Sequence, residues 1–151
     1  MKLQFLIISL FIALTAPMVN AGEPDYLALL AEESEIKAIA VVSHVQRMSR
    51  NSDGTFMRVS FKRKYAVTPY TPKKFVGGCK TMENNWQKRA QGTVYFKPRK
   101  GQTVYVTITT NGGAITSYTP INAQLDAVIR REPHRVAYSK GRANVIPKRD
   151  M

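Results

Sequence analysis

The feature that most constrains this fold is a segment whose side chains alternate in polarity for a full strand length. Residues 55–67, "TFMRVSFKRKYAV", place apolar side chains on one face and mostly basic or small polar ones on the other. Such a strand belongs in a sheet with one buried face. Asp53-Gly54 precedes it and suits a tight hairpin, so the β-branched segment 36–47 is the predicted partner strand. Arg63 interrupts the inward set, and we expect a β-bulge or a sharp coiling of the strand there.

The second half of the chain predicts three more strands. Asn111-Gly112 lies between two alternating segments and is the strongest local hairpin signal in the sequence. Two prolines exclude a central strand from residues 69–78, and "VGGC" is interpreted as a turn formed by Gly77 and Gly78. The three further strands are predicted at 92–97, 102–110 and 114–120.

Two short helices flank the predicted strands. The first is acidic, with five carboxylates and no base in residues 22–35. The second begins at Asn122, which suits an N-cap, and ends with two arginines, which favour a helix C-terminus. The predicted division is an acidic helix at 22–34, one β-barrel domain at 35–138 with the second helix at 122–132, and a flexible basic tail at 139–151.

The first 21 residues are predicted to be a cleavable signal peptide. Lys2 provides the positive n-region, residues 3–14 are mostly apolar, and Val19 and Ala21 fit the small-residue cleavage rule. The apolar core is shorter than a membrane-spanning helix requires, which favours cleavage after Ala21 over an uncleaved anchor. The sequence therefore predicts a secreted or periplasmic protein.

Cys79 is the only cysteine, so the chain has no internal disulfide. Two interpretations stay open: a small buried hydrophobe, or a thiol that pairs with another chain in an oxidising compartment. A catalytic thiol would need a base, and only His44 and His134 are available. Because these three residues lie in separate segments without metal-ligand spacing, we predict no metal site and no cofactor.

Five short strands without a disulfide favour a mainly β protein, a small five-stranded OB-like barrel with short flanking helices. "GQTVYVTITTNGGAITSYTPI", with "AIAVVSHV" and "GGCKT" before it, resembles the netrin-module and metalloproteinase-inhibitor branch of OB folds over residues 35–121. The resemblance implies architecture alone. This chain lacks the paired N-terminal cysteines through which the inhibitors of that group bind a protease zinc.

The charge of the chain indicates an anionic partner. The formal net charge is +13, and residues 58–100 hold twelve basic residues against one acid, Glu83. Anionic lipid headgroups, an envelope polymer or an acidic protein are the expected partners, with nucleic acid only incidental. The alternative is that the charge only keeps the protein soluble. The candidate anion-binding residues are Arg58, Lys62, Lys64, Lys73, Lys74, Lys97, Arg99 and Lys100, with aromatic support from Tyr65, Tyr70 and Trp86.

The sequence favours a binding module over an enzyme. No nucleophile elbow, phosphate-binding loop or dinucleotide fingerprint is present, and paired carboxylates are scarce after residue 35. A structural or assembly subunit of an exported complex is the alternative, joined through an edge strand or Cys79, as a homo- or hetero-oligomer. Trp86 is predicted to fill one end of the barrel.

Overall fold

The computed structural model describes residues 25–150, and the predicted signal peptide lies outside this range. The first helix, α2 (Tyr26–Glu33), corresponds to the predicted acidic helix. It begins where the Asp25 carboxylate accepts a hydrogen bond from the Ala28 N–H at 3.0 Å. This N-cap satisfies one of the amides that the first helical turn leaves free. None of the helices in residues 25–150 is long and apolar enough to cross a membrane.

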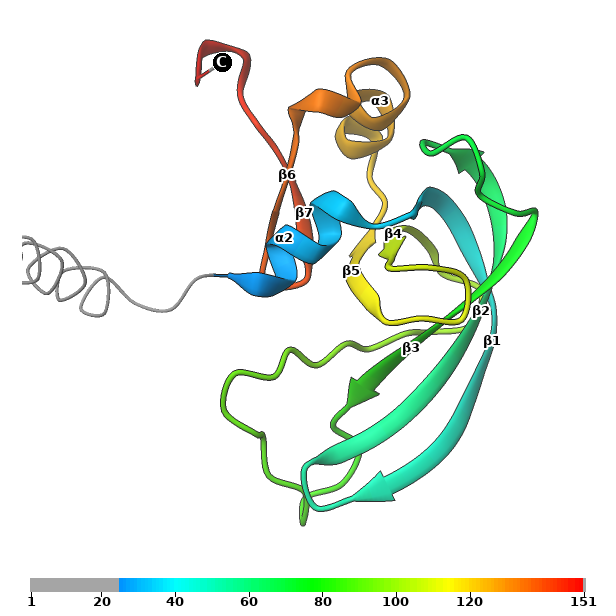
Figure 1. Cartoon of the computed structure of the whole chain (residues 1–151), viewed down its shortest axis with the longest axis vertical. Helices are drawn as coiled ribbons and strands as arrows, with labels where there is room; N and C mark the ends of the chain where they lie inside the picture. Colours follow the sequence, from blue (N-terminus) through cyan, green and yellow to red (C-terminus); the bar gives the residue numbers. More distant parts are fainter. Residues whose placement is uncertain (1–24, 151) are drawn as a thin grey trace, which may run out of the picture.

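The protein is mainly β, as predicted, and its main element is a curved five-stranded antiparallel sheet in the order β3-β2-β1-β4-β5 (Figure 1). β1 and β2 form a long hairpin that extends beyond the other strands (Figure 1). The strands are β1 (Ile36–Asn51), β2 (Gly54–Ala66), β3 (Lys74–Thr81), β4 (Thr103–Ile108) and β5 (Ile115–Pro120).

Local turn chemistry predicted both hairpins correctly. β1 meets β2 at Gly54, whose φ is +140°, and the loop between β4 and β5 contains Gly112 with a φ of +89°. The predicted bulge is also confirmed. Consecutive β1 residues pair with Tyr65 and Arg63, which leaves Lys64 as the extra residue on β2.

The third predicted strand is wrong. Residues 92–97 form no strand, and β3 lies instead in the segment that its prolines had assigned to a loop. Both prolines precede β3, so neither removes an amide from the β2–β3 ladder. The rings of Phe61 on β2 and Phe75 on β3 stack with centroids 5.2 Å apart, and this cross-strand pair stabilises the ladder.

Gly77 and Gly78 lie inside β3, so their predicted role in a turn is wrong. Neither has a positive φ. A Cβ on Gly77 would lie 2.7 Å from Cγ1 of Ile115, and a Cβ on Gly78 would lie 2.7 Å from Cζ of Phe56. The two positions therefore exclude side chains because neighbours approach the backbone on both faces of the strand.

The two ends of the sheet approach each other without forming a ladder. Gly78 and Ala114 form one isolated parallel bridge. Gly78 N–H donates to the Gly113 carbonyl at 2.9 Å, and Gly112 N–H donates to the Val76 carbonyl at 2.8 Å. We call this line the β3–β5 seam. Because no continuous ladder crosses it, the sheet is not closed into the predicted barrel.

Apolar side chains pack on both faces of the sheet. The inner cluster combines residues of all five strands with Phe96 from the long loop before β4. The outer cluster joins Ile39 of β1 and Tyr105 of β4 to α3 (Ala123–Arg131), β6 (Val136–Ser139) and β7 (Arg142–Val145). Short 3-10 turns occupy Pro133–Arg135 and Lys148–Asp150. These outer elements fix the C-terminal hairpin against the sheet.

The helix α3 begins as predicted, because the Asn122 side-chain oxygen accepts a hydrogen bond from Leu125 N–H at 2.8 Å. The strand β7 was not predicted, since it lies in the segment assigned to a flexible tail. It pairs with β6 in an antiparallel hairpin, with Ser139 opposite Arg142. α2 lies beside this hairpin (Figure 1).

Candidate functional site

The eight predicted anion-binding side chains are all exposed, but they divide between two places. One group lies on β2 and at the start of β3. The other lies in the loop before β4. The first group is Arg58, Lys62, Lys64, Lys73 and Lys74, and the second is Lys97, Arg99 and Lys100.

In the β2–β3 group, two positive charges lie directly opposite each other on neighbouring strands. Lys62 and Lys74 pair directly across the two strands. Directly opposed like charges destabilise a sheet by a few tenths of a kcal/mol, up to about 1 kcal/mol. Neither lysine forms an ion pair with a carboxylate that the structure describes. The neighbouring Arg63 is engaged structurally, since its guanidinium donates to the Thr71 carbonyl at 2.7 Å.

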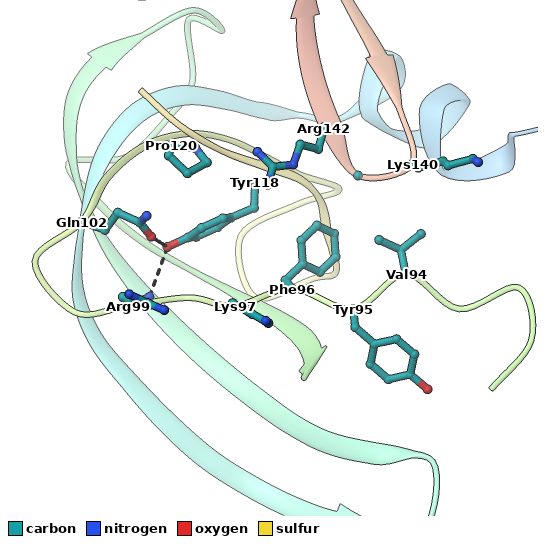
Figure 2. Close-up of a pocket in the computed structure, with 11 residues that line it drawn as sticks. Val94, Tyr95, Phe96, Lys97, Arg99, Gln102, Tyr118, Pro120, Lys140 and Arg142 are labelled. Atoms are coloured by element: carbon teal, nitrogen blue, oxygen red, sulfur yellow. Dashed lines mark hydrogen bonds between the residues drawn. The ribbon is translucent and has the colours of Figure 1, made fainter. Parts of the chain in front are cut away.

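Two residues of the second group, Lys97 and Arg99, line a cavity of about 360 Å³ between the loop before β4, the end of β5 and the β6–β7 turn (Figure 2). This volume is within the range of small-ligand pockets. We call it the basic pocket. It is lined by Val94, Tyr95, Phe96, Lys97, Arg99, Gln102, Tyr118, Pro120, Lys140, Gly141 and Arg142.

The inner wall of the basic pocket is formed by packed aromatic residues. Tyr118 is 6% exposed and Phe96 is 8% exposed. The Tyr118 hydroxyl donates to Oε1 of Gln102 at 2.5 Å and accepts from Arg99 N–H at 3.2 Å (Figure 2). Burial raises the pKa of the Tyr118 hydroxyl, while the Arg99 N–H acts in the opposite direction. The hydroxyl is therefore a neutral donor that orients Gln102, whose amide nitrogen can donate to a ligand.

The outer wall is the two-residue turn between β6 and β7. Lys140 has a φ of +50° and Gly141 a φ of +81°, as the tightest hairpin turns require. Gly141 accepts a hydrogen bond from Tyr118 N–H at 2.9 Å, and its α-carbon lies so close to Phe96 that a Cβ would be 2.8 Å from the ring. The turn and the aromatic wall thus fix each other's position.

Four cations and no acid line the basic pocket: Lys97, Arg99, Lys140 and Arg142. None of the four forms an ion pair with a described carboxylate. Arg142 points toward the space between Tyr118 and Pro120, whereas Lys140 points away from it (Figure 2). A concave wall whose cations form no ion pairs concentrates anions.

One carboxylate lies at the margin of the pocket. Asp25 accepts a hydrogen bond from Lys140 N–H at 2.9 Å, and this bond, with the Ala28 N–H, lowers the pKa of Asp25. The contact ties the start of α2 to the β6–β7 turn. Asp25 therefore offsets part of the Lys140 charge without lining the cavity.

Sequence reasoning found only half of these cations. Lys140 and Arg142 lie in the segment that was predicted to be a flexible tail. Tyr118 and Gln102 lie in predicted strands, where nothing marked them as site residues. A signal was present, because "KG" lies between two short apolar segments and could have been interpreted as a hairpin turn.

The predicted aromatic support does not gather at the pocket. Tyr65 packs beneath Arg130, whose guanidinium carbon lies 4.8 Å from the ring centroid, and Tyr70 is 85% exposed in the loop before β3. Trp86 is 56% exposed, so the prediction that it fills a barrel end is wrong. It lies in the loop after β3, which packs against the β1–β2 hairpin tip through Gln87.

Cys79 faces the inner core and is 6% exposed. Burial raises the pKa of its thiol to about 12, so the thiol is protonated at neutral pH. Within residues 25–150, no three His, Cys, Asp or Glu side chains cluster as metal ligands would. No family model, curated protein or solved structure matches this chain. The resemblance to netrin modules stays a prediction.

Proposed function

We propose that this protein is a non-enzymatic binding module for an anionic partner, with the basic pocket as its primary site. The observation that carries the proposal is the recessed cavity lined by four cations and no carboxylate. A bound anion gains Coulomb energy there, and the partly buried walls weaken solvent screening. Export by the predicted signal peptide would place this module in the periplasm or outside the cell.

The pocket combines charge with shape. Apolar groups of Val94, Phe96 and Pro120 line it beside the cations, and Gln102 adds an amide. A ligand with an anionic group and a compact organic body can use both kinds of contact. The lining has no histidine, cysteine, serine or carboxylate, and its remaining candidates for a base or nucleophile are lysines and tyrosines. Burial raises the pKa of Tyr118, which keeps its hydroxyl protonated. These features favour binding over turnover.

The architecture that we propose for this module is an OB-type barrel that is left open at the β3–β5 seam. In its support, β1 lies between β2 and β4, and β3 meets the start of β5 in a parallel sense. A five-stranded Greek-key barrel of this type binds oligosaccharides or oligonucleotides across its loops and one sheet face.

The alternative of an assembly subunit has less support. The outer edge of β3 is occupied, because Val76 N–H donates to Asn111 Oδ1 and Lys80 accepts from Phe96 N–H. Cys79 is buried, so a disulfide to another chain would require the core to open.

Salt-gradient elution from a heparin column tests the proposal with three variants that each lose two positive charges. R99Q/R142Q removes cations from the pocket, and K88Q/R131Q removes two exposed cations from the loop after β3 and from α3. We expect R99Q/R142Q to elute at clearly lower salt than wild type and K88Q/R131Q to elute close to it. K62Q/K74Q reports the contribution of the β2–β3 face. Equal elution of all variants and wild type would reject a specific anion site.

A further inference from the structure

Resting on the proposed function, we infer that the ligand is a linear acidic polysaccharide rather than a small anion. One end occupies the basic pocket, and the chain then passes over the loop 99–101 onto the outer face of β2 and β3. The juxtaposition of these two basic surfaces, which are separate in the sequence, carries the inference.

Hydrogen bonds place the loop at the end of the pocket against β1, the strand that separates this loop from β2 and β3. Gly101 N–H donates to the Val42 carbonyl at 2.7 Å, and Val42 N–H donates to the Gln102 carbonyl at 2.9 Å. The loop that carries Arg99 therefore lies against the middle of β1. The next β1 residue, Val41, pairs with Lys62, and Lys62 pairs with Lys74. Strand spacing puts these lysines about 5 and about 10 Å from β1 along the same row.

The basic residues along this path, from the loop to β3, have no carboxylate partners. Arg99 and Lys100 are exposed at the loop, and Lys62 and Lys74 are exposed on the strands. None of them pairs with a carboxylate that the structure describes. The direct Lys62–Lys74 opposition costs stability in the free protein. A polyanion lying across both strands would relieve that repulsion, whereas an anion confined to the pocket would not.

The pocket wall favours a sugar over a nucleobase. Stacking with a base requires an exposed aromatic face, and the wall residues Tyr118 and Phe96 are almost completely buried. The third aromatic residue of the lining, Tyr95, is half-buried, and the Arg89 guanidinium already lies 5.1 Å from its ring centroid. A sugar ring needs only apolar contact and hydrogen-bond partners for its hydroxyls, which Pro120 and the Gln102 amide can supply. Lys97, Arg99 and Arg142 can then pair with its sulfate or carboxylate groups, whereas Lys140 points away from the cavity.

The test measures fluorescence anisotropy of labelled heparin disaccharide and octasaccharide, with galacturonate oligomers of the same lengths to separate sulfate from carboxylate recognition. We expect the octasaccharide to bind wild type at least about tenfold more tightly than the disaccharide. K62Q/K74Q should lose most of that length advantage and keep the disaccharide affinity within about twofold. R99Q/R142Q should weaken both oligomers, and K88Q/R131Q neither.

Several results would overturn the inference. If the octasaccharide gains nothing over the disaccharide, or if K62Q/K74Q weakens both equally, the ligand is a small anion and only the proposed function survives. If oligothymidylate of matched charge binds more tightly than both glycans, the partner is nucleic acid. If no glycan and no oligothymidylate binds, the proposed function fails as well. Thermal melting of each variant shows that a loss of binding is not a loss of folding.

Discussion

Replacing Gly141 with alanine should cost more stability than the same change at Gly92, although the two residues have nearly the same φ. Gly141 has a φ of +81° and Gly92 a φ of +80°. A Cβ at Gly141 would lie 2.8 and 2.9 Å from two ring carbons of Phe96 and 2.9 Å from Cγ1 of Val94. A Cβ at Gly92 would meet no heavy atom within 4 Å. Comparing the two variants therefore separates the free-energy cost of the left-handed backbone from the cost of the steric clash with Phe96 and Val94.

The expected magnitudes follow from these two costs. A residue with a Cβ loses roughly 1–2 kcal/mol in the left-handed region, and replacing glycine returns about 0.4–1 kcal/mol by restricting the unfolded chain. Gly92→Ala should therefore lower the free energy of unfolding by about 0.5–1 kcal/mol. Overpacking adds about 1–3 kcal/mol, because Phe96 and Val94 belong to a packed wall. Gly141→Ala should lose about 2–4 kcal/mol.

Urea denaturation followed by circular dichroism measures the difference. Small proteins have slopes of about 1–3 kcal/mol/M, so the two midpoints should differ by roughly 1 M. A second measurement links the turn to the site. Because the added methyl group pushes Phe96 away from the β6–β7 turn, Gly141→Ala should also weaken binding of the heparin disaccharide, and Gly92→Ala should not. Equal midpoints with equal slopes would refute the reasoning, since they would mean that the turn does not press on Phe96.

Two further outcomes are expected. Asp25→Ala should lower stability by about 1 kcal/mol at neutral pH through loss of the N-cap. Because hydrogen bonds from Lys140 and Ala28 lower the pKa of Asp25 below 3.8, this stabilisation is present above that pH and declines as the pH falls through the folded-state pKa. Thermal melts at neutral and strongly acid pH should show a shrinking gap between variant and wild type, and a constant gap would contradict this. Cys79 should react slowly with a thiol reagent in the native protein, because burial raises its pKa to about 12, and rapidly in guanidinium; fast native reaction would contradict its burial.

The parts of the fold that could be predicted depend on neighbouring residues. Gly54 and Gly112 belong to turns whose chemistry is local, and the alternation of β2 is visible in the sequence. β3 could not be found in this way, because glycines weaken its own strand signal and its formation depends on pairing with β2. Residues 92–97 show the reverse. They alternate in polarity, yet the sheet offers them one backbone bond, from Phe96 N–H to the Lys80 carbonyl.

The residues of the candidate site could likewise be predicted only where the local sequence marks them. Lys97 and Arg99 attracted attention because they lie in a long basic stretch. Arg142 lies more than forty residues farther along the chain, and only the packing of the β6–β7 turn on Phe96 brings it to the same cavity. Trp86 was misassigned because large aromatic side chains are usually buried, a tendency that says nothing about one particular loop.

The β3–β5 seam has a consequence for how the molecule moves. Its central strands are held by continuous ladders, but the seam depends on one bridge and a few hydrogen bonds between glycine-rich segments. Opening there breaks these bonds and the packing of Gly77 against Ile115, but it leaves the ladders between the other strands intact, so it requires less free energy than unfolding the whole sheet. The amide protons of Gly78 and Gly112 should therefore exchange with solvent through local opening, while those in the middle of β1 exchange only through global unfolding. The sheet is therefore expected to open along the seam between β3 and β5, while the central strand β1 stays paired with β2 and β4.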